Sequence, residues 1–532
     1  MGIFISIPKT VERVLTAVAF AVLLCFSAYR QTGVLQSSGY SNAKYFKWVR
    51  KKGNLAFARY GLLAMLCALS YAVVAMCFSF TGGYSAIIGL AAYVLFFAVY
   101  LRADAKIALR SEVVLTPRLY RLYAVFFFVA AVISYIFVTL LNFADAVWGN
   151  AVFSYLRYCP LALLPVLVIP MLMLSNAVAK IYEVPHNGKF IKTAKKKLAQ
   201  SDIKVIGITG SYGKTSTKFI LTEILSKKYR VLTTPRSHNT PIGIALAVNN
   251  NNLSDYDVFV AEMGARHIGD ISELCRLCPP QISVITGVCG QHLETFGTFE
   301  NIVKAKGEIL AYTSGTAVIA DDCFDLFEPF PAQKERCACV TDIECSPEGT
   351  SFTLTLGGKS GRVSTKLLGR HSACNIGIAA QTAYLAGMSF EEIADAVGGL
   401  EFIEHRLQLI KANGVNILDD GYNSNVKGAR AALEVLDSFG GRKIVVTPGL
   451  VELGVLEESE NYELGKNLVG YDSVILVGDT LVTPIRRGYT DGGGDAEKIV
   501  TVPTLDEAQE RLKGFIQTGD TVLFLNDLPD IY

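Results

Sequence analysis

Long unbroken apolar stretches dominate the first third of the chain, whereas the remainder alternates short apolar runs with helical patterns. A helix needs about 20 residues to cross a hydrocarbon core of about 30 Å. Five stretches reach or approach that length: Val14–Tyr29, Tyr60–Phe80, Tyr84–Leu101, Leu122–Phe143 and Pro160–Ile181. The pattern predicts an N-terminal α-helical membrane domain of about five spans over residues 1–183.

Beyond residue 183, short apolar runs have the length of buried parallel strands, and amphipathic helical patterns separate them. The clearest runs are Lys204–Thr209, Val258–Val260, Ser283–Thr286, Val415–Leu418, Val474–Val477 and Thr521–Leu525. The glycine pair Gly398-Gly399 interrupts this pattern and is typical of a hinge between rigid units. We therefore expect two α/β domains, a central one over 184–399 and a C-terminal one over 400–532.

Positive charge alternates along the links between the apolar stretches, which predicts their orientation. Basic residues gather in the first link, the third link and the segment after the last stretch, whereas the second and fourth links have almost none. The first link contains Arg30, Lys44, Lys47, Arg50, Lys51 and Lys52, and the third contains Arg102, Lys106, Arg110, Arg118 and Arg121. The segment after the last stretch contains Lys189, Lys192 and Lys195 to Lys197. By the positive-inside rule the N-terminus lies outside, and everything after Ile181 lies in the cytoplasm.

A cleaved signal peptide is the alternative for the first stretch, because Lys9 and Arg13 precede a short apolar run. No A-x-A cleavage site follows that run. The net charge of +2 over 532 residues gives no argument for a nucleic-acid partner. The 12 cysteines fit reduced thiols better than a disulfide framework. Cys275 and Cys278 form a CxxC pair, but neither this pair nor the set Cys323, Cys337, Cys339 and Cys345 has the regular paired-knuckle spacing of a zinc site.

A glycine-rich turn follows the first short apolar run and leads directly into a helical pattern. Converging backbone N–H groups in such a turn, together with the helix dipole, bind phosphate. Lys214 would reach the β- and γ-phosphates, and the Thr215 hydroxyl would ligate Mg²⁺. The spacing is not the strict GxxxxGK[ST] because Ile208 occupies the place of the first glycine. The predicted ATP-binding residues of this loop are Gly210, Ser211, Gly213, Lys214, Thr215 and Ser216.

Three further residues are candidate metal ligands, but only one of them is indicated by the local pattern. Glu262 ends an apolar strand, where its carboxylate would face the phosphate site and hold Mg²⁺. His292 alone is more typical of a surface or packed imidazole, and Lys306 alone is a charge on an exposed helix.

The loop from Thr209 to Thr217 resembles the nucleotide loop of the Mur ligase family, and further segments resemble the family's central domain. They are Asn239–Gly243, Phe259–Ala265, Ile285–Gly287, Gln291–Glu294 and Lys304–Lys306. The resemblance implies that His292 binds a second Mg²⁺ ion and that Lys306 is carbamoylated by CO₂. It also makes Lys214, His292 and Lys306 the expected catalytic residues, and Thr215, Glu262, His292 and Lys306 the expected metal ligands.

The C-terminal part resembles the same family, and specifically its branch that adds a dipeptide to a muramoyl peptide. Gly369–Ala380 matches the family's HN-x-x-N segment, with Ser372 in place of the usual asparagine. Asp419–Asn425 is similar to the DDxYNxN signature, and Lys443–Gly454 to the strand and loop that follow it. The resemblance implies nucleotide contacts by Asn375, Arg406, Asp420, Tyr422 and Asn423, and a doubly wound C-terminal domain.

These resemblances imply an ATP-dependent ligase that forms an amide bond through an acyl phosphate, with two Mg²⁺ ions and a carbamoylated lysine as cofactors. The expected partners are a cell-wall peptide precursor, UDP-linked or lipid-linked, an amino acid or dipeptide, and membrane lipid. The expected location is the bacterial cytoplasmic membrane, multi-pass, with the catalytic domains in the cytoplasm.

Two departures concern substrate recognition. Helices replace the family's UDP-sugar-binding domain, and Leu525–Leu528 replaces the Lys-Gly-Ser-Arg turn that touches the acceptor. The alternatives are a polyglutamate-type amide ligase and a membrane protein that uses the ATPase domain for transport or signalling.

Overall fold

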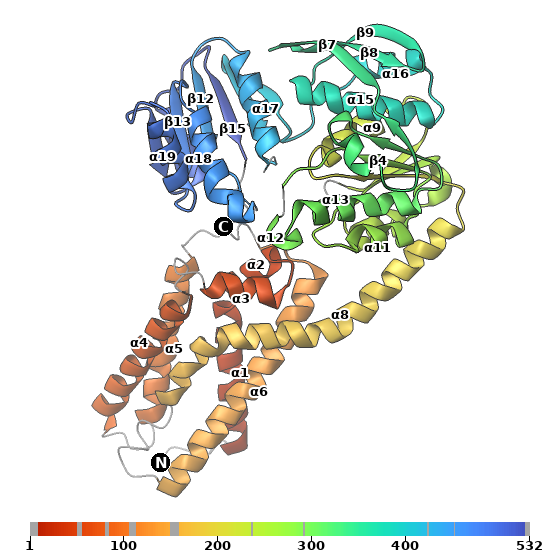
Figure 1. The fold of residues 1–532 in the computed structure, drawn as a ribbon. Helices are drawn as coiled ribbons and strands as arrows, with labels where there is room; N and C mark the ends of the chain where they lie inside the picture. Colours follow the sequence, from red (N-terminus) through yellow and green to blue (C-terminus); the bar gives the residue numbers. More distant parts are fainter. Residues whose placement is uncertain are drawn as a thin grey trace. The chain divides into compact units, whose positions relative to one another are not determined.

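The computed structural model describes residues 9–50, 56–79, 85–105, 113–148, 159–235, 238–290, 293–422, 425–451 and 453–526. The chain divides into two compact units, one up to His186 and one from Asn187 to Leu528 (Figure 1). The domain boundaries predicted at residues 183 and 399 stay predictions. Several predicted residues lie outside the described residues, namely Lys51, Lys52, Lys106, Arg110, His292 and Asn423.

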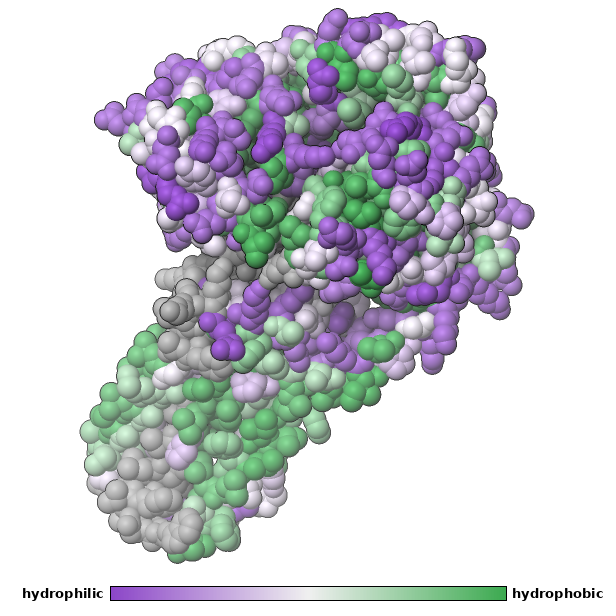
Figure 2. Space-filling model, in the orientation of Figure 1, coloured by the Kyte–Doolittle hydropathy of each residue, from purple (hydrophilic) through white to green (hydrophobic). Residues whose placement is uncertain are grey.

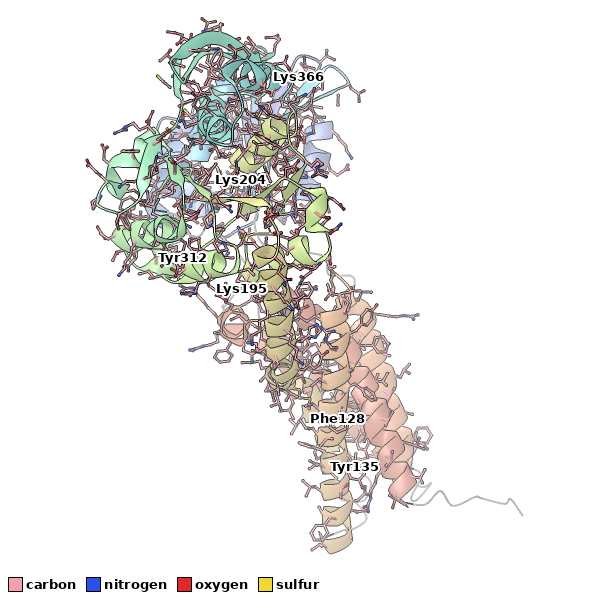
Figure 3. All side chains as sticks on the ribbon, turned by 90° about the vertical axis from the view of Figure 1, so that its right-hand side faces the viewer. Phe128, Tyr135, Lys195, Lys204, Tyr312 and Lys366 are labelled. Atoms are coloured by element: carbon pink, nitrogen blue, oxygen red, sulfur yellow. The ribbon has the colours of Figure 1, made fainter. Side chains whose placement is uncertain are left out.

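The first unit is entirely helical in its described part. Its elements are α1 (Lys9–Ser27), α2 (Tyr29–Ser37), α3 (Asn42–Arg50), α4 (Ala56–Cys77), α5 (Ser85–Ala105), α6 (Pro117–Trp148), the 3₁₀ helix η3 (Cys159–Leu167) and α8 (Val168–Ala199), which continues into the second unit. Apolar residues cover much of the described surface of this unit that is visible in Figure 2. Phe128 and Tyr135, which lie along α6 in Figure 3, are among the exposed large apolar or aromatic side chains.

The predicted number of five spans is not confirmed. Within the described residues, three helices are long and apolar enough to cross a membrane, with apolar parts over Tyr60–Cys77, Pro117–Val147 and Leu163–Ala199. A fourth span arises only if α1 and α2, which are bent by 49° at their junction, count as one. In α5 the apolar part, Ile88–Val99, is shorter than a span requires.

The sequence pattern did not predict α2 and α3, which lie in the basic link after the first apolar stretch. Side-chain hydrogen bonds hold these short helices in place. The Tyr45 hydroxyl donates to Gln31 Oε1 at 2.9 Å, and the Asn176 amide of α8 donates to Asn42 Oδ1 at 2.7 Å. Such pairing between polar groups is what allows them to be buried among apolar helices.

The second unit begins with an α/β domain built on a six-stranded parallel sheet in the order β2-β3-β1-β4-β5-β6. The strands are β1 (Lys204–Thr209), β2 (Val231–Thr233), β3 (Val258–Glu262), β4 (Ile282–Ile285), β5 (Thr316–Ile319) and β6 (Gln333–Arg336). The main helices are α9 (Lys214–Leu225), α10 (Pro241–Asn249), α11 (Asp270–Leu277), α12 (Leu293–Phe296), α13 (Phe299–Gly307), α14 (Phe324–Phe327), α15 (Arg370–Leu385) and α16 (Phe390–Gly398). The 3₁₀ helices are η4 (Leu253–Asp255), η5 (Glu308–Tyr312) and η6 (Asp321–Cys323).

The central strands are buried on both faces, which explains why they read as continuous apolar runs. The chain leaves β1 through α9 to the sheet edge at β2, while β4 pairs with the other side of β1. Such a reversal of strand order opens a crevice at the carboxyl ends of the strands. A separate antiparallel sheet, β7 (Cys339–Ser346), β8 (Gly349–Leu356) and β9 (Lys359–Thr365), packs against α15 and α16.

The C-terminal domain carries a second six-stranded sheet in the order β10-β11-β15-β12-β13-β14, parallel except for β10. Its strands are β10 (Gln408–Ala412), β11 (Val415–Asp420), β12 (Lys443–Thr447), β13 (Ser473–Val477), β14 (Ile499–Val502) and β15 (Thr521–Leu525). Its helices are α17 (Val426–Asp437), η7 (Gly454–Leu456), α18 (Glu457–Asn467), α19 (Val482–Asp491) and α20 (Leu505–Lys513). The prediction of a helical N-terminal region followed by two α/β domains is confirmed.

Two helices of the C-terminal domain, α18 and α19, cross at glycines. A Cβ atom on Gly488 would lie 1.9 Å from the carbonyl oxygen of Tyr462, and one on Gly465 would lie 2.1 Å from that of Ile485. Backbone atoms cannot rotate out of the way as a side chain can. The close approach of the two helices therefore depends on the absence of a side chain at these positions.

We predict that Gly488→Ala lowers the apparent melting temperature of the protein. Alanine gains about 1 kcal/mol over glycine inside a helix, whereas forced overpacking costs about 1–3 kcal/mol or more. The collision is with backbone, so we expect the loss to exceed the gain and the melting temperature to fall by roughly 3–8 °C. Gly440→Ala, at a glycine with open space around it, is the control. Unchanged melting of Gly488→Ala would contradict this account of the helix crossing.

Candidate active site

The loop between β1 and α9 adopts a conformation that only glycine tolerates at two positions. Gly210 has φ of +152° and Gly213 has φ of +76°. A Cβ atom would lie 2.2 Å from Thr286 Oγ1 at Gly210, and 2.9 Å from Asn375 Oδ1 at Gly213. Gly213 is also the N-cap of α9, so the loop presents the amino end of that helix to the crevice. This geometry is the one that the sequence predicted for a phosphate-binding loop.

Lys214, the first residue of α9, folds back over this loop. Its Nζ donates hydrogen bonds to the carbonyl oxygens of Gly210 at 2.7 Å and Ser211 at 3.4 Å. Burial lowers the pKa of Lys214, and the nearby Glu262 carboxylate partly opposes that shift. Two uncharged carbonyl oxygens thus hold the Lys214 ammonium at the phosphate-binding loop.

Glu262, at the end of β3, lies beside the loop because β3 pairs with β1 in a register that aligns Glu262 with Ile208. Its side chain accepts hydrogen bonds from Thr215 Oγ1 at 3.1 Å and from Asn239 Nδ2 at 3.2 Å. The carboxylate and the hydroxyl are both oxygen ligands of the type Mg²⁺ prefers. Two of the four predicted metal ligands, Thr215 and Glu262, are therefore adjacent.

Lys218, which the sequence analysis missed, is the ion-pair partner of Glu262. Its Nζ lies 3.3 Å from Glu262 Oε2, and the two side chains are 0% and 1% exposed. It also donates to the carbonyl oxygen of Thr234 at 2.9 Å. Burial lowers the pKa of Lys218. Lys218 lies four residues after Lys214 and so on the same face of the helix. This spacing was the feature of the sequence that could have indicated a second lysine near the site.

Lys306 is buried, which corrects the expectation of an exposed charge. It is 2% exposed near the end of α13, whereas its neighbour Lys304 is exposed as expected. Burial, followed by repulsion from Lys214, lowers the pKa of Lys306 to about 7. Packing of α13 against the central domain turns one of the two lysines inward, which local sequence could not reveal. His292, the remaining predicted metal ligand, lies outside the described residues.

Within the residues that the structure describes, no three histidine, cysteine or carboxylate side chains converge as a ready-made metal site. Cys275 and Cys278 are buried thiols. Burial raises the pKa of Cys275 to about 12, so the thiol stays protonated. Thr215 and Glu262 remain the described pair suited to Mg²⁺.

The C-terminal domain contributes Arg406, Asp420 and Tyr422 to the same crevice. Asp420, at the end of β11, is buried and accepts a hydrogen bond from the backbone N–H of Leu407 at 3.0 Å. Arg406 Nη1 donates to the carbonyl oxygen of Tyr422 at 2.7 Å. Burial lowers the pKa of Arg406, with Asp420 opposing the shift. Asn423 lies outside the described residues.

Backbone strain is concentrated on both sides of Arg406. His405 and Leu407 have φ of +57° and +49°, a region that residues other than glycine rarely adopt. His405 Nδ1 lies 2.7 Å from Asp419 Oδ2, which holds the strained turn on the sheet. Strain of this kind persists where the surroundings fix it and is enriched at functional sites. The strained turn lies beyond the glycine pair where the sequence placed the hinge.

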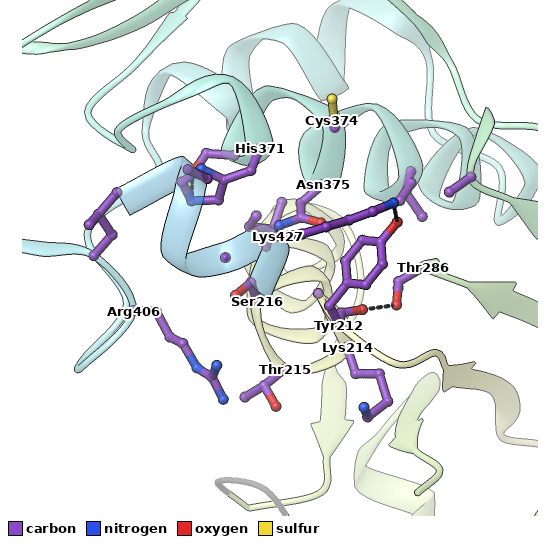
Figure 4. A pocket seen from close by; sticks show the side chains of 18 of the residues that line it. Tyr212, Lys214, Thr215, Ser216, Thr286, His371, Cys374, Asn375, Arg406 and Lys427 are labelled. Atoms are coloured by element: carbon purple, nitrogen blue, oxygen red, sulfur yellow. Dashed lines mark hydrogen bonds between the residues drawn. The ribbon is translucent and has the colours of Figure 1, made fainter. Parts of the chain in front are cut away.

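A cavity of about 620 Å³ brings these side chains together between the two α/β domains (Figure 4). Of the predicted residues it is lined by Ser211, Gly213, Lys214, Thr215, Ser216, Glu262, Asn375, Arg406, Asp420 and Tyr422. Gly210 and Lys306 are not among its lining residues. The cavity has the size and the mixture of apolar walls and polar groups typical of a small-molecule site.

The cavity also has lining residues that the predicted site did not include, among them Tyr212, Asp322, His371 and Lys427. His371 Nδ1 is buried without a hydrogen-bond partner, and burial lowers the pKa of this imidazole to about 4. A neutral imidazole with a free nitrogen can hydrogen-bond a ligand. Its place at the start of the HN-x-x-N-like segment was the signal that could have identified it.

Comparison with known proteins finds two family models on this unit. The Mur ligase middle domain matches residues 208–383, and the Mur ligase, glutamate ligase domain, matches residues 405–526. Two curated relatives, each a UDP-N-acetylmuramoyl-tripeptide–D-alanyl-D-alanine ligase, are 32% identical. The one from Escherichia coli aligns over 52% of this chain and 65% of its own length, and the one from Bacillus subtilis over 51% and 62%. The chain thus spans less than two thirds of either relative.

Solved structures give the same assignment. A crystal structure of MurF from Acinetobacter baumannii is 26% identical with a TM-score of 0.59, covering 65% of this chain and 78% of that one. The MurF ligase from Thermotoga maritima in complex with ADP is 26% identical with a TM-score of 0.58, covering 65% and 81%. The helical first unit lies outside the regions that the two family models match.

The two matched domains together cover more than half of the chain, and they coincide with the two α/β domains that form the cavity. The chain therefore belongs to the Mur ligase family.

Proposed function

We propose that this protein joins an amino acid or dipeptide to a cell-wall peptide precursor at the expense of ATP. The observation that carries the proposal is the cavity in which Lys214 and the Thr215–Glu262 pair face Arg406 and Asp420 from the other domain. The relatives named as tripeptide–D-alanyl-D-alanine ligases favour a dipeptide over the polyglutamate-type alternative. The ADP complex of a solved relative supports a nucleotide in this cavity.

In the proposed reaction, a carboxylate oxygen of the precursor attacks the γ-phosphorus of ATP, and the bond to ADP breaks. The incoming amine then attacks the acyl phosphate carbon, loses a proton, and expels inorganic phosphate as the amide forms. Lys214 and Arg406 neutralise developing negative charge, and Thr215 with Glu262 would hold Mg²⁺. Preorganised cations in a water-poor site supply much of the rate enhancement in such transfers.

The carbamoylated state of Lys306 is part of this proposal. An uncharged amine can attack CO₂, forming an N–C bond and releasing a proton, whereas an ammonium cannot. With a pKa of about 7, a substantial fraction of the Lys306 side chains is neutral near pH 7. The carbamate would supply two oxygen ligands for Mg²⁺, and His292 would be a further ligand of the second ion.

The first unit is proposed to be a multi-pass membrane domain that places the ligase domains in the cytoplasm and helps to hold a membrane-linked precursor. Support comes from its long apolar helices, its exposed apolar surface, and the exposed lysines 189, 192, 195 and 196 at the far end of α8. The proposal keeps the five spans of the sequence pattern. The exposed apolar side chains of this helical unit are the reason to expect a lipid-linked substrate.

Lys214→Ala should reduce ATP-dependent ligation by about a hundredfold or more, because it removes the cation from the phosphate-binding loop. The measurement is ADP release by the detergent-purified protein with a muramoyl tripeptide and D-alanyl-D-alanine. Lys411→Ala, on the exposed edge strand β10, is the matched control and should behave like the parent. Parent-like turnover by Lys214→Ala would refute the proposed role of this loop.

Carbamate formation at Lys306 should increase with pH, because only the neutral amine reacts with CO₂. As pH falls below about 7 the amine becomes protonated, so labelling with ¹³C-bicarbonate should give a carbamate NMR signal at pH 8 that largely disappears at pH 6. Lys306→Met should lack the signal at both pH values, and Lys304→Met, at the exposed neighbour, should keep it. A signal that survives in Lys306→Met would show that another amine carries the carbamate.

The membrane-linked substrate is tested with the full chain in detergent micelles. We expect kcat/KM for a polyprenyl-linked muramoyl peptide to exceed that for the soluble UDP-linked form by at least about tenfold, because each buried apolar group adds to binding. The same dipeptide and ATP concentrations serve both assays. Equal use of the soluble substrate, undiminished after removal of residues 1–183, would contradict this part of the proposal.

A further inference from the structure

Tyr212, Asp322 and Lys427 meet at the cavity, although they come from three distant segments. Tyr212 is in the phosphate-binding loop, Asp322 is in η6 after β5, and Lys427 is in the first turn of α17. The Tyr212 hydroxyl donates a short hydrogen bond to Asp322 Oδ2. Lys427 Nζ donates to the same carboxylate oxygen at 2.8 Å and to the Tyr212 hydroxyl at 3.0 Å. The C-terminal domain is thereby joined to the phosphate-binding loop itself.

The position of the Tyr212 ring is fixed from the central domain. A Cβ atom on Gly287 would lie 2.2 Å from the ring, so the ring packs directly against a backbone without a side chain. Thr286 Oγ1 donates a hydrogen bond to the Tyr212 carbonyl oxygen, as Figure 4 shows. Burial, followed by the bond to Asp322, raises the pKa of Tyr212 well above its ordinary value. The phenol therefore keeps its proton and acts as the donor to Asp322.

Lys427 contacts the Tyr212 ring as well as its hydroxyl. Its Nζ lies 4.8 Å from the ring centroid, within the range of a cation–π contact. In Figure 4 the Tyr212 side chain points toward Lys427 and Asn375, whereas Lys214 points the other way. All three residues line the cavity, and Tyr212 and Lys427 lie at the end from which the Lys214 side chain points away in Figure 4.

We propose that Tyr212, Asp322 and Lys427 form a latch that closes this end of the cavity and so retains the bound nucleotide. Lys427 is a positioning residue: it holds the C-terminal domain, with Arg406 and Asp420, against the phosphate-binding loop. The inference rests on the proposed function, because it assigns the gated ligand as the adenine nucleotide. The inference adds Lys427 to the residues that act at the proposed nucleotide site.

The strength of the latch suits a contact that must open in every cycle. The Lys427 and Asp322 side chains are 52% and 47% exposed, so water and salt screen their attraction. The shared Tyr212 hydroxyl makes the three groups interdependent, since each bond orients the others. Removal of the Lys427 cation or the Asp322 carboxylate should therefore break all the contacts of the latch, and a higher salt concentration should weaken the latch.

The first experiment measures dissociation of a fluorescent ADP analogue from the detergent-purified full chain by stopped flow. Lys427→Ala and Asp322→Asn should each speed dissociation by about three- to tenfold, and the double variant should be no faster than the faster single variant. Tyr212→Phe, which keeps the ring, should have a smaller effect. Arg430→Ala removes another exposed cation one turn along α17 and should match the parent.

In the ligation assay the same variants should raise KM for ATP more than they lower kcat, whereas a general loss of folding would lower kcat through the amount of active protein. Parent-like dissociation in Lys427→Ala, or single effects that multiply in the double variant, would overturn the latch.

A second measurement needs no nucleotide and separates the latch from the proposed function. Amide hydrogen exchange in the loop 210–216 and in the first turn of α17 should quicken in Lys427→Ala but not in Arg430→Ala. Failure of the parent to bind the ADP analogue would count against the proposed nucleotide site, whatever the exchange shows. Unchanged exchange in Lys427→Ala would count against the latch, whatever the parent binds.

Discussion

The buried ion pair between Lys218 and Glu262 is the interaction on which the site geometry depends. Both side chains are almost fully removed from water, and Glu262 also accepts hydrogen bonds from Thr215 and Asn239. An ionised carboxylate in such a place is tolerated only when its partners are complete, and loss of one partner typically costs about 3–5 kcal/mol. The pair connects helix α9 to the end of strand β3. It therefore fixes the phosphate-binding loop, which precedes α9, relative to the sheet.

The second constraint comes from the C-terminal domain, which must bring its own charges to the same crevice. Asp420 emerges at the carboxyl end of β11, and the strained backbone at His405 and Leu407 aims Arg406 at the loop. Here the hydrogen bond from the Leu407 N–H to Asp420 ties the turn to the strand. Each domain thus holds its charged groups rigidly on short, well-anchored connections. A small displacement of one domain relative to the other can therefore assemble or separate the site.

Local sequence features predicted the strands, the phosphate-binding loop and the place of Glu262, because each depends on neighbours along the chain. Lys306, Lys218 and Lys427 could not be interpreted in that way. Whether a lysine on a helix is solvated or buried depends on what packs against the helix, and Lys304 and Lys306 differ only in that respect. The contact of Lys427 with Asp322 joins segments that are 105 residues apart. The helical unit shows the same limit, because apolar length alone could not predict the bend between α1 and α2 or the short helices in the basic link.

The charges around the cavity indicate what kind of ligand completes it. Lys214, Lys218, Lys306 and Arg406 all have pKa values lowered first of all by burial. They also repel one another: Arg406 lowers the pKa of Lys214, and Lys214 lowers that of Lys306. Glu262 and Asp420 are the buried carboxylates near these four groups, so this part of the site holds more cationic than anionic side chains. A polyphosphate would reverse that imbalance and restore the protonated lysines. Conversion of Lys306 into an anion beside such a ligand would add further negative charge, and divalent cations would then be required to bring phosphate and carbamate together.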